Sequence, residues 1–295
     1  MLKFDEQKQL DSVNGALALR KDIEDIVDTI CGKGYKNICW MGIGGTYASC
    51  LQAEVHMKEK SAIDFFVENA AEYLTTGNRK IGKGTIVIVS SVTGSTEEMV
   101  KGVAKAKTAG AEIIGFIDVP ESMLAQSVDH EIAYAGNEQL KFFMTADRFM
   151  YQAGEFPDYE AYYAEMDAHL AQALVDTEKA ADAFGEVFAQ KHMNDRMHYF
   201  VGAGNQYGAV YSYAMCYWEE QHWLRTKSIH SAEFFHGMLE VVDRDTPVTV
   251  FVGEDAQRPL SLRVAAFLPR ICANYTIIDT KDYPLAGISQ QYRGS

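Results

Sequence analysis

The segment GIGGTY at residues 42–47 recurs as GAGNQY at residues 202–207, so both have the form G-x-G-x-x-Y. Each copy follows an apolar run typical of a buried strand and precedes a helical pattern. A motif that returns with the same neighbours indicates that one α/β unit has been duplicated. This repeat constrains the fold more than any other feature, because it predicts two domains of the same architecture.

Apolar runs and helical patterns alternate around both copies of the motif. The runs with strand character are residues 36–42, 62–68, 84–91 and 112–118 in the first half, and 197–204, 247–254 and 275–280 in the second. The stretches with helical spacing are about 46–60, 96–109, 205–224 and 257–270. A polar region rich in Ala and Glu, 157–192, predicts connecting helices. Strand, helix and strand in this order imply right-handed crossovers, so the sequence predicts a largely parallel sheet in each half.

The composition restricts the partners that this chain can bind. There are 27 Lys and Arg residues against 41 Asp and Glu residues, which gives a net charge of −14. Nucleic acid and anionic membrane surfaces would be repelled, so we expect neither as a partner. The five cysteines are scattered and form no CxxC pair, which predicts neither a disulfide framework nor a zinc site. Without a secretory signal or an apolar run long enough to span a bilayer, a cytoplasmic protein is expected.

Two loops of the first half have the composition of an anion site. GIGGTYAS at 42–49 places Thr46 at the start of a predicted helix, and SSVTGSTEE at 90–98 crowds four hydroxyl groups around Gly94. Backbone N–H groups at a helix start, together with hydroxyls, can bind a phosphate without a lysine. Both loops follow predicted strands, and ligands of parallel α/β sheets collect at such strand ends.

The simpler interpretation is that these Ser, Thr and Gly residues only form turns and helix caps, with Thr96 as the N-cap of the next helix. Two such loops at corresponding strand ends favour the anion site. The second half carries Glu254 and Asp255 in the equivalent loop, where their charges would repel a phosphate. A dinucleotide fold is disfavoured, because Tyr47 occupies the place of the third glycine in G-x-G-x-x-G, although Glu68 lies near the end of the next strand.

These loops, the duplication, and a helical glutamate followed by HSAEFFHG at 230–237 resemble the sugar isomerase (SIS) family. Within it, the chain is similar to the fructosamine-6-phosphate deglycases and, more distantly, to the isomerase domain of glucosamine-6-phosphate synthase. The resemblance implies an α/β fold of two tandem SIS-type, flavodoxin-like parallel-sheet sandwiches, with domains at 1–156 and 157–295. It also implies a homodimer or higher homo-oligomer with sites at or near the subunit interface.

The resemblance further implies roles for individual residues. The phosphate of a sugar phosphate would be contacted by Gly45, Thr46, Ser91, Thr93, Gly94 and Thr96. Glu220 would be the acid and base, and His236 would open the sugar ring or shuttle a proton. Glu220 lies sixteen residues before His236, the separation found in these relatives, and the neighbouring Glu219 is the alternative.

The chemistry of these residue types agrees with such roles. A carboxylate whose pKa is raised by burial can take a proton from one carbon and return it to the next. The aromatic residues of CYWEEQHW at 216–223 are expected to desolvate Glu220, and the charge of Glu219 would raise its pKa further. His236 could exchange a proton near pH 7. His222 is assigned to structure, and His230 is either a substrate neighbour or a buried structural histidine.

The predicted function is therefore a sugar-phosphate deglycase. It would cleave a fructosamine 6-phosphate to glucose 6-phosphate and a free amine, with no metal and no redox cofactor. The alternatives are an aldose–ketose or amino-sugar phosphate isomerase, which would use the same proton transfer, and a non-catalytic sugar-phosphate sensor. A sensor has no need of Glu220 or His236, and no helix-turn-helix pattern precedes the first strand.

Overall fold

The computed structural model describes residues 4–294, which form two compact units. The N-terminal unit consists of Asp11–Tyr163, and the C-terminal unit of Ala164–Ser295 together with Met1–Leu10. Helices α1 (Glu6–Ala18) and α7 (Tyr159–His192) each contribute residues to both units. The domain limits expected from the sequence, 1–156 and 157–295, stay a prediction.

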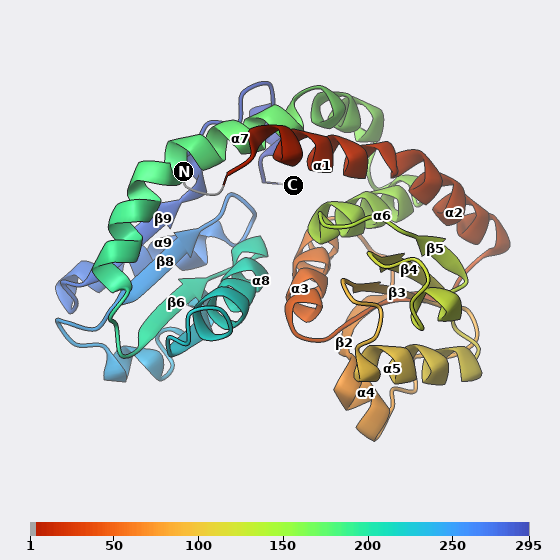
Figure 1. Cartoon of the computed structure of the whole chain (residues 1–295), viewed down its shortest axis with the longest axis horizontal. Coiled ribbons are helices and arrows are strands. Elements are labelled where there is room, and N and C mark those ends of the chain that lie inside the picture. The colour runs from red at the N-terminus through yellow and green to blue at the C-terminus, as the bar shows by residue number, and fades with distance from the viewer. Residues whose placement is uncertain (1–3, 295) are drawn as a thin grey trace. The chain divides into compact units, whose positions relative to one another are not determined.

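The N-terminal unit is a five-stranded parallel sheet with helices on both faces (Figure 1). Its strands are β1 (Asn37–Gly42), β2 (Phe65–Asn69), β3 (Thr85–Ser91), β4 (Glu112–Ile117) and β5 (His130–Ile132). Its helices after α1 are α2 (Arg20–Lys33), α3 (Gly45–Lys58), α4 (Ala70–Thr76), α5 (Glu97–Thr108) and α6 (Glu138–Gln152). The strand order β2-β1-β3-β4-β5 is that of flavodoxin-like folds, which confirms the predicted fold class.

Side chains alternate between the two faces of the sheet along each strand, so this unit has an apolar layer on each face. Cys39, Val87 and Ile113 face α4 and α5, whereas Trp40 points to the other face and packs on Phe142 of α6 with 5.0 Å between ring centroids. Every residue of β1 and β3 is buried, as expected for central strands of a parallel sheet that is covered on both sides.

The C-terminal unit repeats this plan with four parallel strands in the order β7-β6-β8-β9. The strands are β6 (His198–Gly202), β7 (Thr226–His230), β8 (Val248–Val252) and β9 (Tyr275–Asp279). Its helices are α7, α8 (Asn205–Ser212) and α9 (Arg258–Phe267), with short turns η3 (Ser231–Glu233) and η4 (Met238–Val241) after β7. The order matches that of β2, β1, β3 and β4, so the predicted duplication is confirmed.

The helix expected over 205–224 is interrupted. Helix α8 ends at Ser212 and continues as a π-helical segment, η2 (Tyr213–Glu219), which holds one extra residue per turn. Trp218 turns inward and is 6% exposed, whereas Glu219 and Glu220 are exposed. The expectation that neighbouring aromatic residues desolvate Glu220 is therefore wrong for this unit, because Trp218 packs toward the sheet, Tyr217 and Trp223 are themselves exposed, and Glu220 is exposed.

Two buried histidines close the base of the C-terminal unit beside Trp218. His198 stacks on Phe200 at 4.3 Å between ring centroids and lies 4.9 Å from Trp218. Burial lowers the pKa of His198 to about 4 and also lowers that of His192. Both imidazoles are therefore neutral at pH 7.

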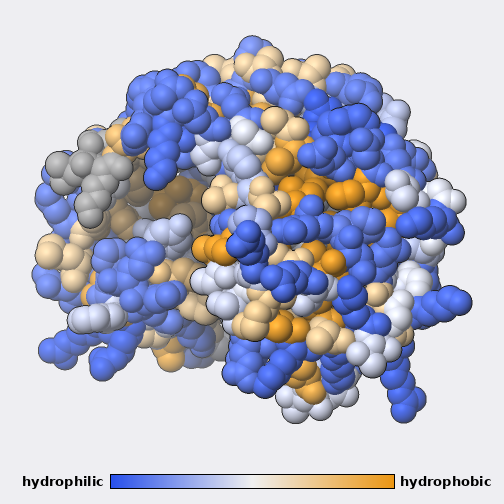
Figure 2. Space-filling model, turned by 45° about the vertical axis from the view of Figure 1, so that its right-hand side comes forward, coloured by the Kyte–Doolittle hydropathy of each residue, from blue (hydrophilic) through white to orange (hydrophobic). Residues whose placement is uncertain are grey.

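Most of the surface seen in Figure 2 is hydrophilic, with apolar residues confined to smaller areas, in keeping with the net charge of −14. Among residues 4–294, no helix is both long enough and apolar enough to cross a membrane.

Candidate active site

The two predicted phosphate loops emerge side by side in the N-terminal unit. Strands β1 and β3 are hydrogen-bonded neighbours, with Met41 paired to Val89, so the loops that follow Gly42 and Ser91 leave the same edge of the sheet. The order β2-β1-β3 means that successive connections run in opposite directions from β1. Such a topological switch point opens a crevice at the carboxyl ends of the strands, where parallel α/β proteins bind ligands.

The first loop forms a tight turn into α3. Gly44 has φ 60°, a conformation that favours glycine, and α3 begins at Gly45. A Cβ atom on Gly42 would lie 2.7 Å from the backbone nitrogen of Tyr47, so the turn requires glycine there too. The Gly44 N-cap position offers no side-chain hydrogen bond, and the first turn of α3 presents backbone N–H groups at the strand end.

The second loop is held by its own hydroxyl groups. Ser91 Oγ accepts a hydrogen bond from Gly94 N at 2.9 Å, and Thr93 Oγ1 accepts one from Ser95 N at 3.3 Å. The turn interpretation is thus correct for these two residues, yet each hydroxyl that accepts an N–H keeps its own proton to donate. Thr96 is at the N-cap position of α5, as predicted, and its side chain makes no capping hydrogen bond.

Gly94 is the most constrained residue of this loop. It has φ 62°, and a Cβ atom at this position would lie 1.9 Å from Ser122 Oγ and 2.4 Å from Ser122 Cβ. Its carbonyl oxygen accepts a hydrogen bond from Leu124 N at 3.0 Å. The loop after β3 is therefore fixed against the segment that follows β4.

Glu138, at the start of α6, was not predicted from the sequence as a site residue. Thr46 Oγ1 donates a hydrogen bond to Glu138 Oε2 at 2.9 Å, which brings a carboxylate next to the first loop. No local sequence signal could have identified this contact, because the two residues are far apart in the chain. A ligand that fits both groups would carry an anion for the loop and a hydroxyl or amine for Glu138.

The equivalent loop of the C-terminal unit is filled by the protein's own carboxylate. Asp255 Oδ2 accepts a hydrogen bond from Asn205 N at 2.9 Å, at the start of α8, and Asp255 Oδ1 accepts one from Gln257 N at 2.8 Å. Glu254 forms an ion pair with Arg293 at 2.6 Å. An anion would have to displace Asp255 from the N-terminus of α8, in agreement with the expectation that only the first half is built for a phosphate.

The predicted acid–base residues lie in the C-terminal unit. Glu219 Oε1 accepts hydrogen bonds from Thr226 Oγ1 at 2.7 Å and from Thr226 N at 3.3 Å, so this carboxylate is oriented by the first residue of β7. Glu220 and His236 are both exposed. His230 Nδ1 accepts a hydrogen bond from Ala232 N at 3.1 Å and caps η3, which is a structural role.

Glu220 and His236 lie on opposite faces of the C-terminal sheet. Glu220 follows Trp218, which packs with Phe200 on one face. His236 follows Phe235, which packs on the other face in the cluster that contains Val201. Successive residues of a strand point to opposite faces, so the unit does not bring this glutamate and this histidine together as a directly interacting pair.

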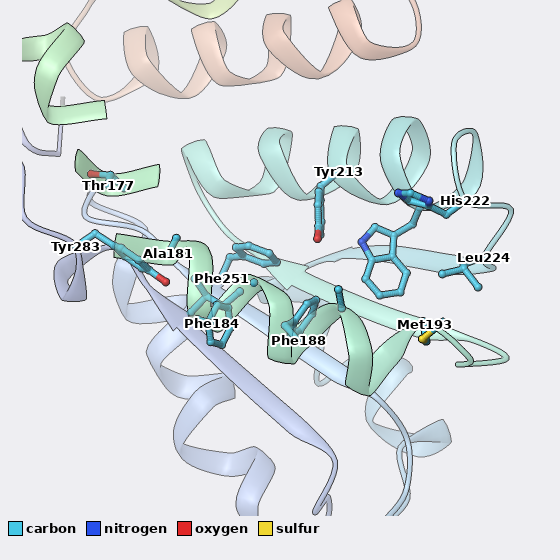
Figure 3. A pocket seen from close by; sticks show the side chains of 14 residues that line it. Thr177, Ala181, Phe184, Phe188, Met193, Tyr213, His222, Leu224, Phe251 and Tyr283 are labelled. Carbon is cyan, nitrogen blue, oxygen red and sulfur yellow. The ribbon is translucent and has the colours of Figure 1, made fainter. Parts of the chain in front are cut away.

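The C-terminal unit also holds an apolar cavity of about 680 Å³ (Figure 3). Six of its lining side chains are aromatic: Phe184, Phe188, Tyr213, Trp218, Phe251 and Tyr283. It contains none of the predicted site residues, and its lining has no lysine or arginine and no start of a helix to bind a phosphate. We therefore exclude it as the substrate site, and His222, assigned to structure, lies on its wall.

Comparison of the two units explains this cavity. In the N-terminal unit, α6 follows the last strand and packs against both α2 and α3. In the C-terminal unit, the described residues after β9, up to Gly294, form only the short turns η6 (Thr280–Asp282) and η7 (Gln290–Tyr292). The groove between α7 and η2 thus lacks, within the described part of the chain, the helix that fills its counterpart.

Residues 34–147, within the N-terminal unit, match the family model described as SIS domain. Fructosamine deglycase FrlB of Bacillus subtilis is 26% identical over 284 residues, which cover 94% of this chain and 87% of that protein.

Solved structures show the same fold. A Bacillus subtilis protein described as a candidate phosphosugar isomerase superimposes with a TM-score of 0.85 at 24% identity, over 98% of this chain and 88% of its own. The C-terminal domain of glucosamine-fructose-6-phosphate aminotransferase from Francisella tularensis superimposes with a TM-score of 0.81 at 16% identity, over 94% of this chain and 83% of its own.

Proposed function

The chain contains a SIS domain at residues 34–147, and from this premise we propose that it is a sugar-phosphate deglycase acting on a fructosamine 6-phosphate. The observation that carries the proposal is the pair of loops at the β1/β3 switch point, where a helix start and a hydroxyl-rich turn converge. The similarity to a fructosamine deglycase over 94% of the chain supports the choice of substrate class.

In the proposed complex the phosphate is bound by the N-terminal unit. The backbone N–H group of Gly45 and the hydroxyls of Ser91, Thr93 and Thr96 would donate to its oxygens. Thr46 would join them by giving up its hydrogen bond to Glu138, and Gly94, whose N–H donates to Ser91 Oγ, would hold the turn against the phosphate. The net charge of the chain is unfavourable for anions in general, so affinity depends on these local donors. Glu138 would accept a hydrogen bond from a hydroxyl or amine elsewhere on the same ligand.

The reaction would begin with the open-chain ketosamine. Glu220 removes a proton from C1 and returns it to C2, while the proton of the C1 amine nitrogen is transferred to the C2 oxygen, so that the C2 ketone with its C1 amine becomes an aldose imine with a C2 hydroxyl. Water adds to the imine carbon, and the C–N bond breaks to release glucose 6-phosphate and the free amine. His236 transfers a proton between the ring oxygen and a hydroxyl when the sugar ring opens.

The positions of Glu220 and His236 support a homodimeric site. Because these residues lie on opposite faces of their own sheet, a site that uses both would take Glu220 from one chain and His236 from a second copy. Symmetric dimers of identical chains commonly build shared sites in this way. Each chain would then contribute to two sites.

Mixing two inactive variants tests this arrangement. Glu220→Gln and His236→Asn chains, unfolded and refolded together in equal amounts, should recover about a quarter of the wild-type activity, since half of the dimers are mixed and each has one intact site. Each variant refolded alone is the control and should remain inactive. If the mixture is also inactive while mixed dimers are shown to form, the shared site is refuted.

The substrate class is tested by product release. The protein is incubated with fructosamine 6-phosphates that carry different amines, and glucose 6-phosphate and free amine are both quantified. Equimolar release of the two products is expected. Interconversion of glucose 6-phosphate and fructose 6-phosphate without amine release would identify an isomerase instead, and binding without turnover would identify a sensor.

A further inference from the structure

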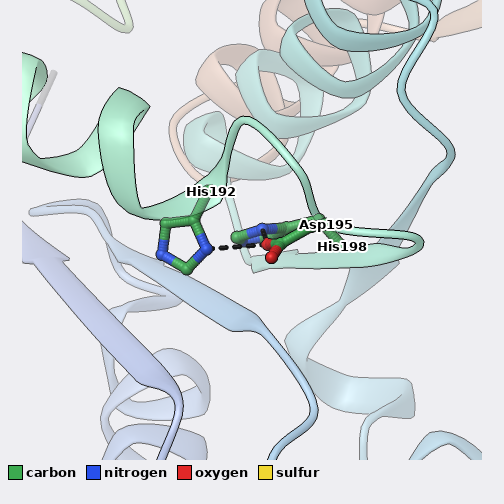
Figure 4. A group of neighbouring side chains, drawn as sticks. All are labelled: His192, Asp195 and His198. Atoms are coloured by element: carbon green, nitrogen blue, oxygen red, sulfur yellow. Dashed lines mark hydrogen bonds and ion pairs between the residues drawn. The ribbon is translucent and has the colours of Figure 1, made fainter.

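A cluster of three possible metal ligands lies in the C-terminal unit and contains none of the residues of the proposed reaction (Figure 4). His192 is the last residue of α7, His198 is the first residue of β6, and Asp195 lies in the connection between them. The spacing H-x-x-D-x-x-H places all three on one short segment that turns from a helix into a strand.

The donor atoms of the cluster converge. One ligand atom from each of the three residues lies within 4.8 Å of the others. Asp195 Oδ2 is 2.7 Å from His192 Nδ1 and 2.9 Å from His198 Nδ1. Two imidazole nitrogens beside one carboxylate oxygen form a donor set that suits zinc and not magnesium or calcium, which prefer oxygen ligands.

The surroundings already orient one of the ligands. His198 Nε2 lies 2.8 Å from the hydroxyl of the buried residue Thr249, which fixes the ring plane. A metal-bound histidine usually forms such a bond through its other ring nitrogen. Phe200 stacks on the same ring and restricts its rotation.

The three residues of the cluster are shielded from solvent to different degrees. His192 is 1% exposed, and its Nε2 atom is buried with no hydrogen-bond partner in the structure. Nε2 is not the nitrogen that faces Asp195, and an ordered water is a common partner of such a buried atom. Asp195, whose side chain is 16% exposed, leaves a path from solvent to the cluster.

We propose that His192, Asp195 and His198 bind one zinc ion or a similar late first-row divalent cation. With bonds of about 2.0–2.1 Å, neighbouring ligand atoms of a tetrahedral site are about 3.3 Å apart, so the two nitrogen–oxygen distances must each lengthen by roughly 0.5 Å. Each Nδ1 proton moves to Nε2 as the nitrogen becomes a ligand, and at His198 the new N–H donates to Thr249. Water completes the coordination.

The role of the ion is structural. It would join the end of α7 to the start of β6 directly below Trp218, whose ring lies 4.9 Å from that of His198. Trp218 belongs to the π-helical segment that also carries Glu219. If the ion binds only the folded state, the free energy of unfolding rises with the logarithm of the ratio of the metal concentration to the dissociation constant.

Titration of the chelator-treated full chain with zinc, in competition with a chromophoric chelator, tests the site. Wild type and the control variant His222→Gln, which removes an exposed histidine outside the cluster, should each bind about one equivalent. Asp195→Asn keeps a hydrogen-bond acceptor for both imidazoles but loses the charged ligand, and should bind at least about 100-fold more weakly. His192→Gln should lose affinity to a similar degree.

Two further readouts separate this site from adventitious binding. Cobalt bound to wild type should give visible d–d bands without thiolate charge-transfer bands, which excludes the free cysteines as ligands. Zinc should raise the unfolding temperature of wild type and His222→Gln but not that of Asp195→Asn. Equal zinc affinity in wild type and Asp195→Asn, or the absence of a stoichiometric site in wild type, would overturn the proposal and leave a hydrogen-bonded clamp.

Discussion

Replacing Glu220 by glutamine should lower kcat on a fructosamine 6-phosphate by about 10²–10⁴-fold, the usual contribution of a positioned acid–base group. Glutamine has nearly the same shape as glutamate but cannot take a proton from C1. The dissociation constant for the phosphosugar should change little, because the phosphate is bound by the loops of the N-terminal unit. Rapid-quench measurement of product formation, together with calorimetric titration of ligand, separates the two quantities.

Glu219→Gln is the matched control for this prediction. Glu219 is oriented by Thr226, so its replacement should perturb the start of β7 and affect stability more than the chemical step. If Glu220→Gln retains full activity and Glu219→Gln loses it, the acid–base role belongs to Glu219, and its hydrogen bonds to Thr226 become the device that positions the base. If both variants are fully active, the proton-transfer mechanism is wrong.

Replacing Gly94 by alanine should weaken phosphosugar binding by at least about 100-fold, because an interior with no free space cannot accept the new atom without displacement. The added Cβ would lie 1.9 Å from Ser122 Oγ and 2.4 Å from Ser122 Cβ, at a residue with φ 62°. The loop would have to move away from Ser122, and the hydroxyls of Ser91 and Thr93 would move with it. Isothermal titration with the phosphosugar measures the loss.

The control variant Gly77→Ala separates the effect of a steric clash from the effect of backbone strain. Gly77 has φ 71°, but the nearest atom to its added Cβ would be Lys105 Nζ at 3.7 Å. This variant should lose about 1–3 kcal/mol of stability, because φ 71° with ψ 175° is a conformation essentially restricted to glycine, and should keep its affinity. Adding Ser122→Gly to Gly94→Ala removes both colliding atoms and should restore part of the binding. Undiminished affinity in Gly94→Ala would show that the loop after β3 does not hold the phosphate.

Some features of the site could be predicted because they depend on local sequence. Glycines before Gly45 and around Gly94 mark turns at strand ends, and the Ser and Thr residues beside them supply hydroxyls wherever the turns lie. The charges of Glu254 and Asp255 likewise argued against a second anion site. The structure shows how an anion is excluded there, because Asp255 itself accepts the hydrogen bond from Asn205 N.

Other predictions were wrong or missing where a short sequence pattern is compatible with more than one local structure. The apolar period over 205–224 is compatible with one continuous helix, but the segment turns π-helical at Tyr213, which changes the direction of every later side chain. Trp218 therefore faces the core, and Glu220 faces away from it. Strand β7 was not predicted, because TKSIH at 226–230 is too polar and too short to stand out.

The sequence by itself determined the duplicated α/β plan, the positions of most strands and helices, and the two loops suited to an anion. These follow from residue periodicity and from turn chemistry, which act between near neighbours. Only the tertiary structure placed Glu138 beside Thr46, put the segments that carry Glu220 and His236 on opposite faces of a sheet, and left the groove between α7 and η2 open. Such contacts join segments that are distant in the chain, so they depend on crossovers and packing rather than on any local pattern.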